Sequence, residues 1–271
     1  MNRELSFEQR VHNAFATQAA AHLKALHRYL HGCGYDREEF QVFWYHSNNT
    51  VWGHGFGRMI GIEQLYLNHI WNIEKPHVAL FEKWQREIPE LIGHDLRSTT
   101  TASAHALSSE VIEVADDGLT VQSFYLTPGS LSGAVWDEED LATTAGDSNG
   151  KSSLHRGNVY MWERYFSEFC FVDGEWKWFH EQVIPDIWGF YDSVDWAWGA
   201  YLRSLETKKF DVVSELDLAA LGDSKPVHKM YSTTQTFQKA VHPPKPYETL
   251  TDENSLSPGY TEFGGEDYVE I

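Results

Sequence analysis

The sequence predicts an α+β domain in which a curved antiparallel sheet is wrapped around helices. Apolar residues at helical spacing dominate the first part of the chain, and runs rich in β-branched and aromatic residues follow. Two Asp-Gly pairs, Asp117-Gly118 and Asp173-Gly174, separate such runs as tight hairpin turns do. Helices first and hairpins afterwards are typical of a sheet that folds round a helix.

Two helices are predicted near the N-terminus. Residues 7–31 form the first, and Gly32 and Gly34 end it. A short second helix is predicted from Asp36, whose side chain suits an N-cap. The apolar face predicted for the first helix consists of Phe7, Val11, Phe15, Ala19, Leu23, Leu26 and Leu30.

Residues 50–61 alternate as a single strand would. Glycines leave one face of this strand bare, which suits the close approach of a helix or a ligand. A long amphipathic helical stretch follows from Gly61, is interrupted at Pro76 and ends near Pro89. The face of the predicted strand that carries side chains consists of Thr50, Trp52, His54, Phe56 and Arg58.

The hairpin at residues 158–186 is the stretch around which the rest of the chain is organised. Alternation places Glu163 on one face of its first arm and Arg164 on the other, among large apolar side chains on both faces. Both faces are therefore expected to be covered. Burying an ionisable group costs several kcal/mol unless the group is paired or used, so this hairpin predicts a pocket wall.

The regions that flank this hairpin have loop-like composition. Residues 129–157, rich in Gly, Ser, Thr and Asp, predict a surface loop and a candidate lid. From about Lys208 onward, Pro, Ser, Thr and acidic residues dominate. We therefore expect one domain over residues 1–205 and an extended C-terminal arm over residues 206–271.

Composition narrows the classes of function. The formal net charge of −19 disfavours nucleic acid and anionic membranes as partners, because both need basic patches. The content of 11 Trp, 13 Tyr and 15 Phe favours a binding cavity or a broad subunit interface, with an aromatic core as the alternative. Cys33 and Cys170 suggest no disulfide framework. No signal peptide or membrane span is recognisable, which makes a cytoplasmic location the expectation.

Three stretches, taken in order, resemble the SnoaL-like branch of the nuclear-transport-factor-2-like superfamily. They are VWGHGFGRMIGIEQL, HALSSEVIEVADDGLTVQSFYLTPG and YMWERYFSEFCFVDGEWKWFHEQVIPD. Each motif is short, and their order and spacing carry the likeness, which covers roughly residues 10–200. The resemblance implies a cone-shaped α+β barrel with a pocket at one end of the cone.

Enzymes in this superfamily include lyases and isomerases without cofactors, such as scytalone dehydratase, bile-acid dehydratases, steroid isomerases and polyketide cyclases. The resemblance implies a cofactor-independent lyase that acts on a bulky aromatic or polycyclic alcohol. Lignin diarylpropane lyase, which releases water and formaldehyde, is the most specific guess. The same fold also serves as a binding module. A non-catalytic role in aromatic-ligand binding or oxygenase assembly therefore stays open, as does an isomerase or cyclase.

Elimination without a cofactor needs a base, an acid and donors for developing negative charge. The resemblance implies catalytic positions at His105 and Tyr45, and His180 is expected to point across the same cavity as His105. Glu163 is expected to pair with Arg164 or Lys177 rather than to orient a histidine. For each candidate a structural role is the alternative. The candidate catalytic residues are Tyr45, His54, Arg58, His105 and His180.

Aromatic and polar side chains are expected to bind the substrate, and about half of the aromatic ones are expected to belong to the core or an interface instead. No H-E-x-x-H, H-x-H or calcium-loop motif occurs, so no metal site is expected. Aromatic residues on the sheet and in the arm predict a homo-oligomer, dimer or trimer. The candidate substrate-binding residues are Trp44, Asn49, Trp52, Tyr125, Trp162, Glu163 and Trp178.

Overall fold

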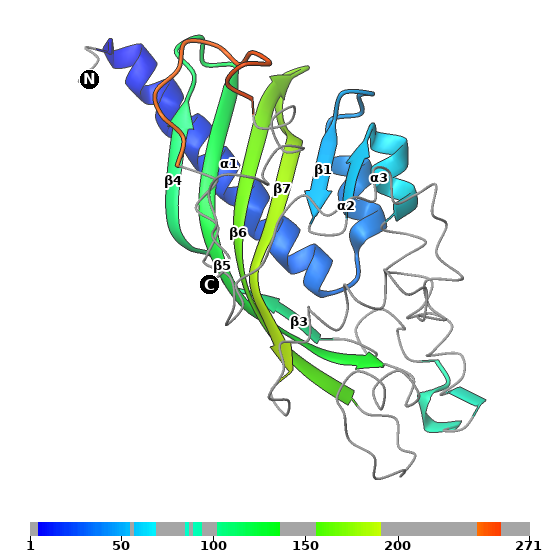
Figure 1. Cartoon of the computed structure of the whole chain (residues 1–271). Helices are drawn as coiled ribbons and strands as arrows, with labels where there is room; N and C mark the ends of the chain where they lie inside the picture. The colour runs from blue at the N-terminus through cyan, green and yellow to red at the C-terminus, as the bar shows by residue number, and fades with distance from the viewer. Residues whose placement is uncertain are drawn as a thin grey trace.

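The fold is one helix lying against a curved, open sheet of seven strands (Figure 1). The structure is a computed structural model, and it describes residues 5–54, 57–68, 85–86, 89–93, 102–135, 156–190 and 243–255. The order of the strands is β2-β1-β7-β6-β5-β3, and β4 also pairs with β5. This arrangement confirms the predicted fold class.

Helix α1, Phe7–Gly32, begins with a capping box at Ser6. The Ser6 hydroxyl accepts a hydrogen bond from the Gln9 backbone N–H (3.2 Å), and the Gln9 side chain accepts one from the Ser6 backbone N–H (2.9 Å). The helix ends at Cys33, and Gly34 follows with a φ of +74°. The local signals at both ends therefore agree with the predicted helix.

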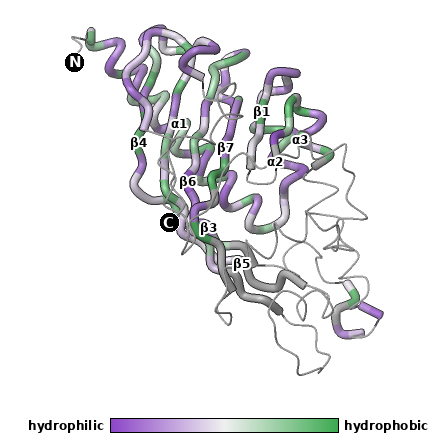
Figure 2. The backbone as a smooth tube through the Cα atoms, viewed as in Figure 1, coloured by the Kyte–Doolittle hydropathy of each residue, from purple (hydrophilic) through white to green (hydrophobic). Residues whose placement is uncertain are grey.

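The apolar face predicted for α1 is wrong in its first part, where Phe7, Val11 and Phe15 are exposed, whereas Leu23 is buried in the core. Phe7 is 68% exposed and Phe15 is 67% exposed. Small side chains on the buried face let the helix lie close to the sheet, and the polar side chains of its C-terminal half find partners there. Figure 2 shows hydrophilic stretches both along α1 and along the strands beside it. The buried residues of α1 are Ala16, Ala20, Leu23, Lys24, His27 and Arg28.

Short helical segments in the described part of the chain accompany α1. They are α2 (Asp36–Val42), α3 (Ile62–Asn68) and the 3₁₀ turn η2 (Pro89–Leu91). The N-cap of α2 is Tyr35 rather than Asp36. Asp36 is the first residue of the helix, and its carboxylate bonds to His31 instead of capping the backbone.

The stretch predicted as one strand forms two, β1 (Val51–His54) and β2 (Gly57–Ile60), which pair in antiparallel fashion. Arg58 lies opposite Gly53, so His54 and Arg58 do not share a face of one strand. A Cβ atom on Gly53 would lie 1.9 Å from Oε1 of Gln182 on β7. The close approach predicted at the glycines is thus made by a side chain of the neighbouring strand.

The long strands build the rest of the sheet: β3 (Ala102–His105), β4 (Ser108–Val114), β5 (Thr120–Val135), β6 (Arg156–Val172) and β7 (Glu175–Phe190). Both predicted Asp-Gly turns are confirmed, as β4–β5 and β6–β7 hairpins. At the second turn, Asp173 and Gly174 have φ values of +53° and +85°, which is the conformation that Asp-Gly favours.

Both ends of the predicted 129–157 loop lie in strands instead, because β5 runs to Val135 and β6 starts at Arg156. The remaining part of that loop lies outside the described residues, and so does the predicted lid. The most deeply buried large side chains of the core include Phe40, Trp44, Tyr125, Phe169 and Trp178. Cys33 and Cys170 are both free thiols.

Residues 243–255, a part of the predicted arm, lie on the chain's own sheet. The backbone N–H groups of Asp116 and Asp117 donate to the carbonyls of Tyr247 and Glu248, both at 3.0 Å. The Gln122 amide donates to the Asn254 carbonyl at 2.8 Å. The rest of the predicted arm lies outside the described residues. Within the described part, no helix has the length and apolar character needed to cross a bilayer.

Candidate active site

A polar stripe on α1 faces the inner surface of the sheet. Lys24, Arg28 and His31 recur at three- and four-residue spacing, which places them on one side of the helix. The Lys24 ammonium donates to the Ser123 hydroxyl at 2.6 Å, and Arg28 donates to the Tyr125 hydroxyl at 3.0 Å. Lys24 and Arg28 of this stripe therefore face β5, and His31 is the next residue of the stripe toward the end of α1.

His31 forms the first histidine–carboxylate pair of the site. Its Nδ1 lies 2.6 Å from Oδ1 of Asp36, and its side chain is 22% exposed whereas that of Asp36 is 3% exposed. Burial lowers the pKa of His31, but the Asp36 carboxylate and its hydrogen bond raise it by more, so the pKa lies above the ordinary 6.5. The pair therefore favours an imidazolium that stands at the more open side of the cluster.

His105 and Glu163 form the second pair. Nε2 of His105 lies 3.9 Å from Oε2 of Glu163, and the Tyr165 hydroxyl donates to the same Glu163 oxygen at 2.6 Å. Glu163 is 1% exposed. The predicted ion pair of Glu163 is wrong: Arg164 lies on the opposite face and binds Asp186 through two nitrogens, and Lys177 pairs with Glu175. Glu163 thus lies within ion-pair distance of a histidine, His105.

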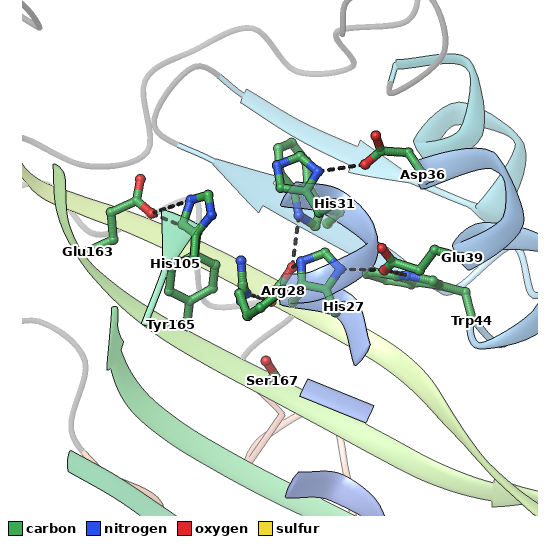
Figure 3. Close-up of polar contacts among 12 residues, drawn as sticks. His27, Arg28, His31, Asp36, Glu39, Trp44, His105, Glu163, Tyr165 and Ser167 are labelled. Atoms are coloured by element: carbon green, nitrogen blue, oxygen red, sulfur yellow. Dashed lines mark hydrogen bonds and ion pairs between the residues drawn. The ribbon is translucent and has the colours of Figure 1, made fainter. Parts of the chain in front are cut away.

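The two pairs lie next to each other between α1 and the sheet, with the two histidine rings between the two carboxylates (Figure 3). The ring centroids of His31 and His105 are 5.8 Å apart. His105 is the last residue of β3 and lies opposite Gly129 on β5. A Cβ atom on Gly129 would come within 2.5 Å of the Ala104 carbonyl oxygen, so glycine lets β3 lie this close.

Arg28 anchors the deeper part of the network. Its guanidinium stacks on the Tyr165 ring, 3.8 Å from the centroid, and donates to Oε1 of Glu181 at 2.8 Å. Tyr125 also donates to Glu181, at 3.1 Å. Burial raises the pKa of Tyr125 and of Tyr165, against the influence of Arg28, so both phenols stay protonated as donors.

A third histidine lies below these groups. His27 is bonded to Glu39, which also accepts from the Trp44 indole at 2.9 Å. The other ring nitrogen of His27 lies 3.5 Å from Glu181, which accepts from the Trp52 indole. Burial, followed by Arg28, lowers the pKa of His27 well below 6.5. His27 is thus held neutral in the core, unlike His31.

His180 does not face this site. Its ring nitrogens lie 2.5 Å from Oε2 of Glu168 and 2.9 Å from the Asn49 carbonyl oxygen. Glu168 also accepts from Gln122 and Ser255, on the outer side of the sheet. The expectation that His180 shares a cavity with His105 is therefore wrong. A β-bulge between the pairs Glu168–His180 and Phe169–Trp178 adds one residue to β7 and moves His180 to the other face.

The remaining predicted residues divide between core and surface. The Tyr45 ring rests edge-on against Phe179, at a centroid distance of 5.7 Å, and Trp162 is half-exposed on the outer face. Asn49 is exposed and contributes its backbone carbonyl to His180. Arg58 is partly buried on β2. The side chain of His54 lies outside the described part of the structure. Trp44, Trp52, Tyr125, Glu163 and Trp178 lie in the interior.

The sequence did not predict several polar residues of the interior, because the apolar pattern of α1 predicts a different buried face. One signal could have identified those on α1: ionisable residues recur at helical spacing in the C-terminal half of this helix. Partners from β6 and β7 carry no local signal, because their roles depend on the sheet register. The missed residues are Lys24, His27, Arg28, His31, Asp36, Glu39, Ser123, Tyr165, Ser167 and Glu181. Among the described residues, no three His, Cys, Asp or Glu side chains are arranged to hold a metal ion.

Comparison with solved structures returns proteins to which this chain is similar at low sequence identity. A candidate scytalone dehydratase from Novosphingobium aromaticivorans is 12% identical, with a TM-score of 0.42 over 69% of this chain and 95% of that one. A hexachlorocyclohexane dehydrochlorinase from Novosphingobium barchaimii is 13% identical, with a TM-score of 0.44 over 69% of this chain and 97% of that one.

A nuclear transport factor 2-like superfamily protein from Salmonella enterica is 13% identical, with a TM-score of 0.36 over 63% of this chain and 92% of that one. No family model matches the sequence, and no curated protein matches it. Likeness at this level does not extend to activity, so the chemistry has to come from the side chains of this chain.

Proposed function

We propose that this protein is a cofactor-independent lyase that eliminates water, alone or with a small fragment, from a bulky aromatic or polycyclic alcohol. The observation that carries the proposal is the meeting of two carboxylate-paired imidazoles, His31–Asp36 and His105–Glu163, with ring centroids 5.8 Å apart. Elimination needs one group that accepts a proton and one that donates a proton, and histidine suits both roles near neutral pH.

The surroundings of the two pairs assign the roles. His31, whose pKa is raised by Asp36, is the acid that protonates the departing hydroxyl. His105 is the base, because the Glu163 carboxylate at 3.9 Å stabilises the imidazolium that forms. The substrate C–H proton moves to His105, the C–O bond breaks, and the hydroxyl leaves as water with the His31 proton. Proton return from His105 to His31 completes the cycle.

A diarylpropane diol is the most specific substrate that we propose. In this case the base takes the proton of the primary hydroxyl, the adjacent C–C bond breaks and formaldehyde leaves. The electron pair forms the new C=C bond as the second hydroxyl departs with the His31 proton, so the products are a stilbene, water and formaldehyde. The aromatic side chains of the interior, Trp52, Tyr125 and Tyr165 among them, favour an aromatic substrate.

The test is turnover of hydroxylated aromatic dimers, steroids and polyketides by the purified protein, with no cofactor added. We expect His31→Gln and His105→Gln each to lower kcat by about 10²–10⁴-fold. His12→Gln is the matched control, since His12 lies on the same helix but contacts the Gly118 carbonyl. If no compound is turned over, or if both variants keep full activity, the protein is not this lyase. Binding without turnover would favour the aromatic-ligand binding alternative.

We also propose that the chain self-associates as a dimer or trimer. Supporting this, Phe7 and Phe15 are mostly exposed on α1, and Trp162 is 50% exposed on the outer face of β6. Light scattering of the full chain and of a chain ending at Thr207 tests it. A monomeric full-length protein would contradict self-association.

A further inference from the structure

Thr127 carries a buried hydroxyl that the fold does not use. The residue lies on β5 and is 0% exposed, and its Oγ1 has no hydrogen-bond partner in the part of the chain that the structure describes. Buried polar groups are nearly always bonded, because leaving one without a partner forfeits its bonds to water. An exception of this kind calls for a specific explanation.

Among the described residues, the buried hydroxyls of Ser123, Ser167 and Thr50 are all bonded. Ser123 accepts from Lys24, and Ser167 bonds to Tyr125 at 3.2 Å. Thr50, equally buried, donates to the Tyr45 carbonyl at 2.6 Å. Valine has the shape of threonine and the same preference for strands, so packing alone would not require a hydroxyl at position 127.

The sheet register places this hydroxyl among the proposed catalytic groups. The pairing of β5 with β6 is unbroken from Thr120 to Ser132, so Thr127 shares the inner face with Ser123 and Tyr125. Thr127 lies directly opposite Glu163, and Gly129, two residues on, lies opposite His105. The contact between His105 and Glu163 therefore crosses β5 at Thr127 and Gly129.

Helix α1 covers the same position from the other side. Lys24 bonds to Ser123 and Arg28 bonds to Tyr125, so each turn of the helix advances by two residues of β5. The next residue of the stripe, His31, consequently comes to the level of Thr127, where it meets His105. The unused hydroxyl thus lies at the junction of the two histidine–carboxylate pairs.

We propose that Thr127 binds an oxygen of the substrate, a hydroxyl or an aryl ether, and so selects oxygenated substrates over hydrocarbon analogues. Its role is binding and not proton transfer. The identity of the substrate rests on the proposed lyase function, but the preference for an oxygen atom does not. Since Oγ1 is closed to solvent, a ligand reaches it through movement of neighbouring side chains, as happens in induced fit.

The test compares the binding of two probes, a diarylpropane diol and the matching diarylpropane that lacks both hydroxyls, by calorimetry. We expect the wild-type protein to prefer the diol. Thr127→Val should weaken the binding of the diol by about tenfold and leave that of the hydroxyl-free probe unchanged, and Thr127→Ser should restore the preference. Equal binding of the diol by Thr127→Val and wild type would overturn the proposal, as would a wild-type protein without preference for the diol.

A crossed control separates binding from folding. Thr50→Val removes a hydroxyl that is bonded to the Tyr45 carbonyl, so it should lower the melting temperature and leave the preference for the diol unchanged. Thr127→Val removes a hydroxyl without a partner, so it should abolish the preference for the diol and leave the melting temperature unchanged. A lowered melting temperature with an unchanged preference in Thr127→Val would show a structural role. If the preference depends on Thr127 but the diol is not converted, the proposed diarylpropane diol substrate is wrong while the assignment of Thr127 stands.

Discussion

The imidazole rings of His31 and His105 lie 5.8 Å apart, although one stands at the end of a helix and the other at the end of a strand. Each ring is held by its own carboxylate, Asp36 or Glu163, from a different element. Two imidazolium rings this close would repel each other, and the raised pKa of His31 favours placing the charge on that ring. In the proposed mechanism one histidine, His31, is therefore the acid and the other, His105, is the base.

The activity is expected to fall as the pH rises, because His31 has to be protonated to act. Asp36 raises the pKa of His31 above 6.5, and kcat should decline above that raised value. Asp36→Asn removes the raising charge and should shift the decline to lower pH. Profiles of kcat against pH for the two proteins measure the shift. A profile that Asp36→Asn leaves in place would contradict the assignment of His31 as the acid.

The same pair should make stability depend on pH with a defined sign. A group whose pKa is raised on folding binds its proton more tightly in the native state. Its contribution is therefore complete below the unfolded value near 6.5 and disappears as the pH rises through the folded value. Urea unfolding at a series of pH values, for wild type and His31→Gln, should show this loss in wild type alone.

Glu163→Gln should lower activity by about 10²-fold and leave the fold intact. The amide keeps the shape and can still accept from Tyr165, but it no longer stabilises a charged His105. Tyr165→Phe is the comparison, since it removes the donor and keeps the carboxylate, and its effect on kcat should be smaller. Equal kcat in Glu163→Gln and wild type would exclude His105 as the base.

Arg28→Met should lower the free energy of unfolding by about 3–5 kcal/mol, because it leaves the buried Glu181 carboxylate without its cation. The double variant Arg28→Met/Glu181→Gln removes both charges and should recover part of the loss. Urea titrations of the wild type, Arg28→Met, Glu181→Gln and the double variant form a double-mutant cycle. A double variant as unstable as the sum of the singles would show that the two residues are not coupled.

His180→Ala should lower stability and leave the chemistry in place. It removes the hydrogen bonds to Glu168 and to the Asn49 carbonyl, at a cost of about 2–4 kcal/mol, since the Glu168 carboxylate is 1% exposed. The measurements are urea unfolding and kcat below the unfolding transition. A large fall in kcat without loss of stability would place His180 in the active site after all.

Turns and strands were predictable from the sequence because their signals are local. Asp173-Gly174 specifies its turn through backbone conformations that these residues favour, and the faces of Glu163 and Arg164 follow from simple alternation. The face of His180 was not predictable, because one extra residue in β7 reverses the alternation beyond it. A bulge depends on the partner strand and has no signature in its own sequence.

The buried side of α1 was not predictable from hydrophobicity either. Phe7 and Phe15 suggest one face, whereas the helix buries Lys24 and Arg28 on another. The reason is that Ser123, Tyr125 and Glu181 provide partners that only the folded sheet brings together. For this reason the His31–Asp36 pair, which is half of the candidate site, could not be predicted from the sequence.

The junction between the two helices gives the His31–Asp36 pair a further asymmetry. His31 stands in the last turn of α1, where the carbonyl ends of the peptide dipoles carry partial negative charge, and Asp36 opens α2, where the N–H ends carry partial positive charge. The backbone dipoles therefore hold the cation and the anion each at the end that favours it. The turn of the main chain between α1 and α2 thus adds to the effect of the Asp36 carboxylate, which raises the pKa of His31.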